Sequence, residues 1–217
     1  MRQWRLGNSS QSRRRRIGAT YHASKRAFDL VVCMLALPIV VPVLLATALL
    51  GKVSSRGPLL FVQERTGFGG RRFKMYKFRT MVPSAAIMKK AIRERNSMVG
   101  PDFKIENDPR VTPIGSFFRK TSLDETPQIW NIIRGDMSLV GPRPTSFDTD
   151  TYELWHTERL EALPGLTGLW QIVGRGQIDF DERVRIDISY VRNRSIWLDV
   201  KILLRTIPAV LFQRGAY

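Results

Sequence analysis

One uninterrupted apolar segment dominates the hydrophobic pattern of the chain. From Leu30 to Leu50 the sequence contains no charged residue. As a single helix this segment would be about 31 Å long, which matches a hydrocarbon core of roughly 30 Å. Length and composition alone therefore indicate a membrane-spanning helix.

Two features of this segment argue against a simple span. Pro38 and Pro42 lie near its middle, and each destabilises an uninterrupted helix by roughly 3 kcal/mol. Both flanks are basic, with Lys25 before the segment and Lys52 after it, so the positive-inside rule places both ends on the cytoplasmic side. We therefore predict a re-entrant, monotopic helix–break–helix hairpin. A proline-kinked spanning helix is the alternative, whereas a signal peptide is disfavoured because no small-residue cleavage site follows so long an apolar run.

Shorter patterns after this segment predict a small α/β domain. Residues 58–63 and 73–78 have the composition of two strands around a glycine-rich turn. The tail is helical up to Pro208 and apolar around most of its circumference, which suits either core packing or an amphipathic helix in the membrane interface. Helical patterns are also present at residues 82–95, 124–134, 146–162 and 179–194.

The positive charge of the chain is unevenly distributed. The chain has 35 Lys and Arg against 19 Asp and Glu, a net charge of +16, and all of the excess lies in the first 95 residues. Such a charge predicts a polyanionic partner: nucleic acid, anionic lipid or a phosphorylated substrate. We expect a disordered basic segment at residues 1–24, the membrane hairpin at 25–52 and a cytoplasmic catalytic domain at 53–217.

Cysteine and histidine are too scarce for two common kinds of site. Cys33 is the only cysteine, so the chain forms no internal disulfide, which fits a reducing cytoplasm. The two histidines, His22 and His156, give no zinc-binding spacing.

An adjacent acidic pair, Asp124 and Glu125, is the strongest candidate for chemistry. Ser122 and Glu125 also have the spacing of a capping box, so the acids could simply stabilise a helix N-terminus. Pro127 argues against Ser122 as the cap, because proline prefers the first helical turn, and a helix that begins near residues 124–126 suits it better. Such a helix end keeps a carboxylate ionised and also favours a nearby phosphate.

Several cations accompany the acidic pair. Arg119 precedes it by five residues, and Arg143 is held between two prolines, where its planar fork could bind phosphate oxygens. Lys77 and Arg79 are further candidates, although a solvated basic hairpin would explain most of the charges around them. Acids beside arginines, without a zinc pattern, suit Mg²⁺-assisted phosphoryl transfer.

With these motifs assembled, the chain resembles the bacterial sugar transferase family, the small monotopic phosphoglycosyl transferases that load a sugar 1-phosphate onto a polyprenyl phosphate. The resemblance runs from about Lys25 to the C-terminus. The family often has Ser-Pro at the hairpin break, whereas this chain has Val41-Pro42. The matching motifs are ERTGFGGRRFKMYKFRTM, NDPRVTPIGSFFRKTSLDETPQIWNIIRGDMSLVGPRP, PGLTGLWQIVGR and DISYVRNRSIWLDVKILLRTIPAV.

The resemblance implies a two-step reaction. Asp124 would attack the sugar-bearing phosphate of a UDP-sugar, expel UMP and form a phosphosugar–aspartyl intermediate, which undecaprenyl phosphate then attacks. It further implies that Glu125 assists as a base or supports the metal site and that Mg²⁺ binds near Asp124. Arg119 and Arg143 would hold phosphates, and Asp187 is a weaker substrate-binding candidate.

The resemblance also implies a setting. We expect the first membrane step of exopolysaccharide assembly at the cytoplasmic face of the bacterial inner membrane, with membrane lipid but no nucleic acid as a partner. Glucose or galactose is favoured, an N-acetylated sugar is the alternative, and a homo-oligomer is left open. Two other classes compete: a non-catalytic polybasic membrane-surface protein, and a nucleic-acid binder, which would explain the charge but not the apolar segment.

Overall fold

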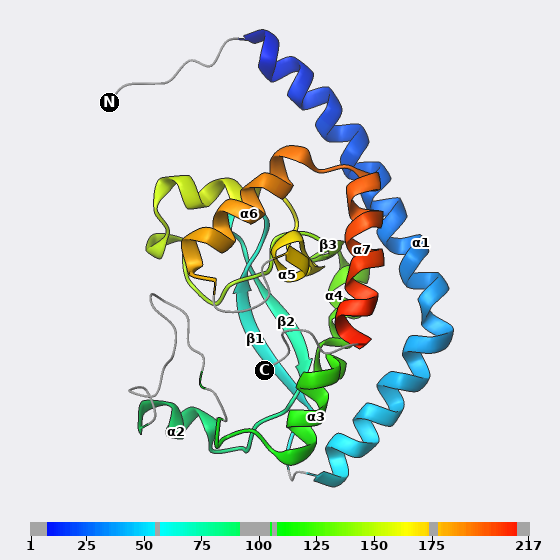
Figure 1. Cartoon of the computed structure of the whole chain (residues 1–217), viewed down its shortest axis with the longest axis vertical. Coiled ribbons are helices and arrows are strands. Elements are labelled where there is room, and N and C mark those ends of the chain that lie inside the picture. The colour runs from blue at the N-terminus through cyan, green and yellow to red at the C-terminus, as the bar shows by residue number, and fades with distance from the viewer. Residues whose placement is uncertain (1–7, 55–56, 92–104, 106–107, 174–177, 212–217) are drawn as a thin grey trace.

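A computed structural model of the chain describes residues 8–54, 57–91, 105, 108–173 and 178–211. One long helix runs along the side of a mixed α/β body, and helix α7 lies beside it (Figure 1). The elements, with 3₁₀ helices labelled η, are α1 (Asn8–Ser54), β1 (Leu60–Thr66), η1 (Phe68–Gly70), β2 (Arg72–Phe78), α2 (Ala85–Ala91), α3 (Pro113–Thr121), η3 (Leu123–Glu125), α4 (Gln128–Arg134), β3 (Ser138–Val140), η4 (Thr149–Thr151), η5 (Leu154–Glu161), β4 (Gly165–Thr167), α5 (Leu169–Val173), α6 (Phe180–Asn193) and α7 (Ile196–Leu211).

Helix α1 is one continuous element of 47 residues, and this corrects the predicted hairpin. The chain stays helical through Pro38 and Pro42, so it does not break and fold back there. Each proline removes one backbone hydrogen bond, but their four-residue spacing places both on the same face, where both are exposed. Bonds lost on one side bend a helix without ending it. Figure 1 accordingly shows α1 curved around the body.

The basic segment before the apolar run also differs from its prediction. Residues 8–24, expected to be disordered, belong to α1, so the boundary predicted at residue 25 falls inside a helix. Arginine and glutamine are good helix formers, and extending an existing helix avoids the cost of nucleation. Residues 1–7 lie outside the described part of the chain.

Lys25 fastens α1 to the body through a buried ion cluster. Its Nζ lies 2.9 Å from Oδ1 of Asp29 on the same helix and 3.0 Å from Oδ2 of Asp199 on α7. Tyr190 of α6 donates its hydroxyl proton to Asp199 across 2.8 Å. Next to this cluster, Arg26 donates to carbonyl oxygens near the C-terminal end of α4. Lys25 and Arg26 therefore hold the fold together, whereas charge counting alone treated them as a flank for the membrane.

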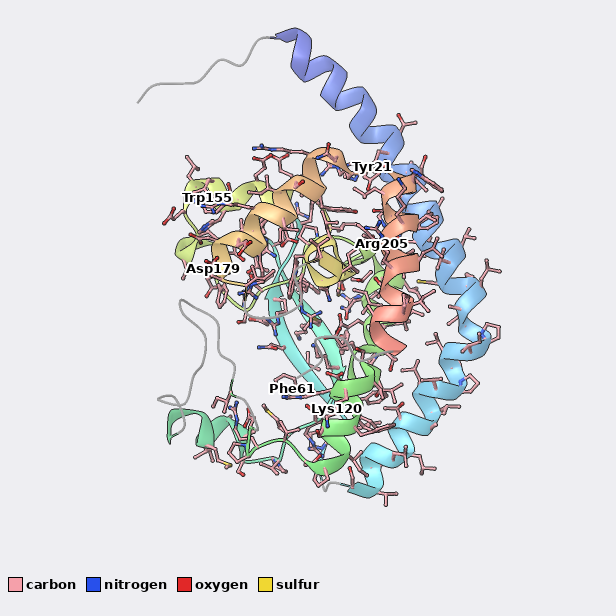
Figure 2. The ribbon with its side chains drawn as sticks, in the orientation of Figure 1. Tyr21, Phe61, Lys120, Trp155, Asp179 and Arg205 are labelled. Carbon is pink, nitrogen blue, oxygen red and sulfur yellow. The ribbon has the colours of Figure 1, made fainter. Side chains whose placement is uncertain are left out.

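The other end of the apolar segment contacts the same body. A Cβ on Gly51 would lie 3.3 Å from Leu59 Cδ1 and 3.6 Å from Phe118 Cε2, so α1 packs closely against the start of β1 and against α3. Among the described helices, Thr20–Ser54 of α1 is long and apolar enough to cross a membrane, and only 11% of its apolar window is buried. Figure 2 shows side chains projecting outward along this helix.

The predicted β-hairpin is confirmed. Strands β1 and β2 pair antiparallel, with Phe61 opposite Lys77 and Arg65 opposite Phe73. A second, parallel pair joins β3 to β4. The buried apolar core draws on α1, β2, α4, β3, α6 and α7, and includes Cys33, Met75, Ile132, Met137, Val140, Tyr190 and Ile202.

The helix predicted at residues 124–134 is divided. The acidic pair lies in the 3₁₀ turn η3, and Pro127 is the N-cap residue of α4. Ser122 makes no side-chain capping bond to η3, so the capping box is not formed, and α4 begins at Gln128, later than the start predicted near residues 124–126.

Three other helix predictions have mixed outcomes. The helix at residues 179–194 is confirmed by α6, whereas residues 146–162 form two 3₁₀ segments. Of residues 82–95, α2 covers 85–91, and 92–95 lie outside the described residues. Pro208 does not end α7, which continues to Leu211 with one face packed on the core and Trp197, Leu204 and Ile207 exposed.

The buried cluster gives a stability prediction. Lys25→Met leaves Asp29 and Asp199 buried without their cation, so we expect unfolding in detergent to become easier by about 3–5 kcal/mol. Lys52→Met, at an exposed position of the same helix, should change stability by less than about 0.5 kcal/mol. Denaturant titrations of both variants provide the comparison. Equal stability of the two would show that the cluster does not hold α1 in place.

Candidate active site

The acidic pair lies in a single turn between two helices. Helix α3 ends at Thr121, and the left-handed backbone of its C-cap residue Ser122 (φ 58°) redirects the chain into η3. Asp124 is buried in this turn, and the side chain of Glu125 is 15% exposed. The two carboxyl groups thus share a partly dry site, where each charge needs nearby compensation.

Two cations from other elements compensate Glu125. Lys77 Nζ on β2 lies 2.6 Å from Glu125 Oε1, and the Arg143 guanidinium reaches both carboxylate oxygens, with Nη1 3.3 Å from Oε2. Burial raises the pKa of Glu125, but Arg143 and Lys77 outweigh burial and hold that pKa below its ordinary value. Glu125 is therefore ionised and suited to holding cations rather than to accepting protons.

Asp124 has the opposite balance. Burial raises the pKa of Asp124 to about 6, the charge on Glu125 adds to this effect, and Lys77, Arg119 and Arg143 oppose it. Arg119 itself donates from Nε to Thr80 Oγ1 across 2.9 Å. Of the acidic pair, Asp124 is the carboxylate whose charge is less compensated, as expected of a reactive group or a cation ligand.

Arg143 lies in a loop that touches a second loop through backbone hydrogen bonds. Gly141 N–H donates to the carbonyl of Thr167, and Gly165 N–H donates to the carbonyl of Pro142, each across 2.9 Å. A Cβ on Gly165 would lie only 2.1 Å from the backbone nitrogen of Gly141, so only glycine allows this approach. The loop around Arg143 is thus fixed by the loop that contains PGLTG.

Asp187 reaches the site indirectly. It is buried on α6, and its Oδ2 accepts from Arg159 Nη2 across 2.6 Å. The same Nη2 donates to the backbone carbonyl of Arg143 across 2.7 Å. The structure therefore places Asp187, predicted as a substrate contact, behind Arg159 as a support for the Arg143 loop.

A cavity of about 100 Å³ opens beside Arg143. Besides Arg143, its lining includes Arg65, Arg159 and Arg183. Burial lowers the pKa of Arg65 to about 10, and Arg143 adds to the effect, yet Arg65 is still charged at neutral pH. A cavity with this lining suits a ligand with several negative charges, such as a diphosphate.

Sequence reasoning missed three of these arginines. The sequence pattern could have indicated Arg65, because strand alternation places it on the same face of the β-hairpin as Lys77. Arg183 and Asp187 are four residues apart, a spacing that shares one helix face. Arg159 had no local signal, because only the tertiary fold brings it to the Arg143 loop.

The four predicted cations do not all lie at one place in the structure. Lys77 and Arg143 meet at Glu125, and Arg119 acts on Asp124 through its charge. Arg79 instead directs its guanidinium toward Gly57, where a Cβ would lie 2.5 Å from Nη1.

The acidic pair is compatible with Mg²⁺. In the described residues, no three His, Cys, Asp or Glu side chains converge on one point. Mg²⁺ often binds through one or two carboxylates together with substrate phosphates and water, so it does not need such a cage. The incompletely compensated Asp124 fits this mode, whereas Glu125 is already engaged by two cations.

Comparison with known sequences identifies the family. The bacterial sugar transferase family matches residues 20–213, which include the apolar segment, the acidic pair and the arginine-lined cavity. The chain belongs to this family, as its motifs predicted.

Relatives within the family differ in length. The chain is 51% identical over 162 residues to the galactosyl transferase CpsE of Streptococcus agalactiae, covering 74% of this chain and 36% of the relative. It is 43% identical over 199 residues to an undecaprenyl-phosphate galactose phosphotransferase of Salmonella typhimurium, covering 89% of this chain and 41% of the relative. It is 41% identical over 203 residues to the exopolysaccharide production protein ExoY of Rhizobium meliloti, covering 89% of this chain and 88% of the relative. The chain therefore spans about two fifths of the first two relatives and most of the third.

The raised pKa of Asp124 gives a prediction about stability. An acid whose pKa is higher in the folded than in the unfolded protein destabilises the fold once it ionises. Asp124→Asn should therefore stabilise the protein by about 1–3 kcal/mol above pH 6, and the gain should disappear below about pH 4. Thermal unfolding across pH measures this, with Asp150→Asn at an exposed position as the control. A loss of stability at pH 7 would contradict the assigned electrostatics.

Proposed function

We propose that the protein transfers a sugar 1-phosphate from a UDP-sugar to undecaprenyl phosphate and releases UMP. The observation that carries this proposal is a buried, incompletely compensated carboxylate, Asp124, beside a cation cluster and an arginine-lined cavity. Relatives named as undecaprenyl-phosphate phosphotransferases for galactose and glucose support the reaction class.

In the first step, an Oδ atom of Asp124 attacks the sugar-bearing phosphorus of the UDP-sugar. The new O–P bond forms as the bond from that phosphorus to the bridging oxygen breaks, and UMP leaves with that oxygen and its electron pair. Arg143 and Lys77 stabilise charge on the transferring phosphate, and the cavity arginines, Arg65 among them, hold the nucleotide phosphates. The product is a phosphosugar–aspartyl intermediate.

In the second step, a phosphate oxygen of undecaprenyl phosphate attacks the same phosphorus. The O–P bond to Asp124 breaks, the carboxylate is restored, and undecaprenyl-diphosphate-sugar is formed. Glu125 holds Lys77 and Arg143 in place in both steps, and we assign it this positioning role because cations hold its pKa low. Mg²⁺, held by Asp124 together with substrate phosphate, would neutralise phosphate charge.

Relatives support a hexose substrate and a glycan pathway. Galactose and glucose are named for phosphotransferases 43% and 42% identical to this chain, and two ExoY relatives are named for exopolysaccharide production. We therefore favour galactose or glucose in exopolysaccharide assembly. N-acetylgalactosamine is the second candidate, because a relative 38% identical is named for that sugar.

We further propose that α1 enters the cytoplasmic face of the inner membrane without crossing it. Near one end Lys25 is bound into the folded body, and near the other Gly51 packs against Leu59 and Phe118 of the same body. A polar domain on one side of a bilayer cannot hold both ends of a spanning helix. Exposed apolar residues between these ends, such as Leu35 and Ile39, would face lipid.

Cysteine labelling tests this placement. Single cysteines at Ala23 and at Lys52, in a background with Cys33→Ser, should both resist a membrane-impermeant reagent in spheroplasts and react after lysis. Labelling of only one of the two before lysis would demonstrate a span.

The reaction is tested by UMP release from a panel of UDP-sugars with undecaprenyl phosphate and Mg²⁺. Asp124→Asn should abolish both UMP release and the covalent adduct, which intact-protein mass spectrometry detects without acceptor. Asp150→Asn, at an exposed position, should retain both. In the wild type, activity should rise with pH through about 6 as Asp124 ionises.

Two variants refine the assay. Glu125→Gln removes the neighbouring negative charge, so the acid limb of the pH profile should move to lower pH even though turnover falls. Arg65→Met should mainly raise the KM for UDP-sugar. Normal turnover of Asp124→Asn would contradict Asp124 as the nucleophile, and a wild type that releases no UMP from any UDP-sugar would instead favour the non-catalytic, polybasic membrane-surface protein.

A further inference from the structure

The β-hairpin of β1 and β2 carries an apolar strip, residues 60–62, that has no role in the reaction described above. Leu60, Phe61 and Val62 follow one another at the start of β1 and are all exposed, Phe61 by 49%. Successive strand residues project to opposite faces, so this part of the strand is apolar on both sides. Over these three residues, within the described chain, β1 pairs only with β2.

Strand register places Phe61 beside the acidic pair. Phe61 lies directly opposite Lys77, and opposite residues of an antiparallel pair project from the same face with Cβ atoms about 5 Å apart. From that face Lys77 reaches Glu125 across 2.6 Å. A half-exposed aromatic ring therefore lies at the edge of the cation cluster that surrounds Asp124.

The strip continues toward α1. Leu59, which precedes β1, packs against Gly51, and Leu49, Leu50 and Val53 around that glycine are exposed. In Figure 2, Phe61 lies toward the end of the hairpin where α1 ends, away from Trp155 and Asp179. Exposed hydrocarbon thus leads from the cation cluster to the end of the apolar helix.

The opposite end of the same hairpin face carries an arginine. Arg65, four residues after Phe61, projects from this face and lines the arginine-rich cavity. Four strand residues correspond to about 13 Å. One face of β1 therefore offers an anion site at one end and an apolar surface at the other, with Lys77 opposite the apolar end.

We propose that Phe61 receives the first isoprene units of the polyprenyl phosphate acceptor, which brings its phosphate to Lys77 and Arg143. This inference rests on the proposed function. The surface suits an amphiphile because cations adjoin exposed hydrocarbon, whereas a UDP-sugar is polar throughout and fits the cavity. The two substrates therefore reach Asp124 from opposite ends of the hairpin.

Steady-state kinetics of matched variants test the proposal. Phe61→Ala should raise the KM for undecaprenyl phosphate about tenfold, the scale of one buried aromatic contact. The KM for UDP-sugar and the yield of covalent adduct without acceptor should not change. Phe68→Ala is the control, because Phe68 is 44% exposed at the turn end of the same hairpin.

Crosslinking gives an independent readout. A photoreactive benzoylphenylalanine at position 61, in phosphatidylglycerol vesicles with a trace of undecaprenyl phosphate, should capture the polyprenyl lipid, and one at position 68 should not. Capture of phosphatidylglycerol alone, or a Phe61→Ala variant with the kinetics of Phe68→Ala, would overturn the proposal. A wild-type protein that forms no adduct would refute the proposed function instead, while crosslinking would still decide whether Phe61 contacts the acceptor lipid.

Discussion

A buried charge needs a partner of opposite charge, and the arrangement of the site depends on how Glu125 obtains its partners. Its carboxylate draws together Lys77 from the hairpin and Arg143 from the proline-flanked loop, two cations that would otherwise repel each other. The Arg143 loop is held in turn by Arg159, which Asp187 neutralises. The site is thus a series of alternating charges, and Asp124 lies beside it with its charge less compensated by cations than that of Glu125.

The same constraint joins the apolar helix to the site. Lys25 is buried between two aspartates, one on α1 and one on α7, and Arg26 donates to carbonyl oxygens near the end of α4. Helix α4 begins just after the acidic pair, so one short helix connects α1 with the reactive turn. On the proposed placement, the height of Asp124 relative to the membrane is therefore set by packing rather than by a flexible linker.

Local signals in the sequence were enough for part of this architecture. Strand alternation and the glycine-rich turn located the β-hairpin. Pro127 correctly indicated that the helix starts well after Ser122. The acidic pair and Arg143 were found because their residue types are informative without a fold. Arg159 and the burial of Lys25 depend on partners 28 and 174 residues away in sequence, which no local pattern reveals. The prediction of a re-entrant membrane hairpin failed because proline was treated as a helix breaker, whereas two prolines on one exposed face bend α1.

Fastening both ends of the apolar segment of α1 to one folded body has a consequence for how a glycan is exported. On the proposed placement, none of the described polar elements passes through the hydrocarbon, so the part of the chain that the structure describes offers its product no path across the bilayer. The sugar stays in the leaflet where it was attached, with its diphosphate at headgroup depth. Moving it to the other leaflet would then require machinery other than the described fold, of a kind that recognises a lipid-linked diphosphate sugar.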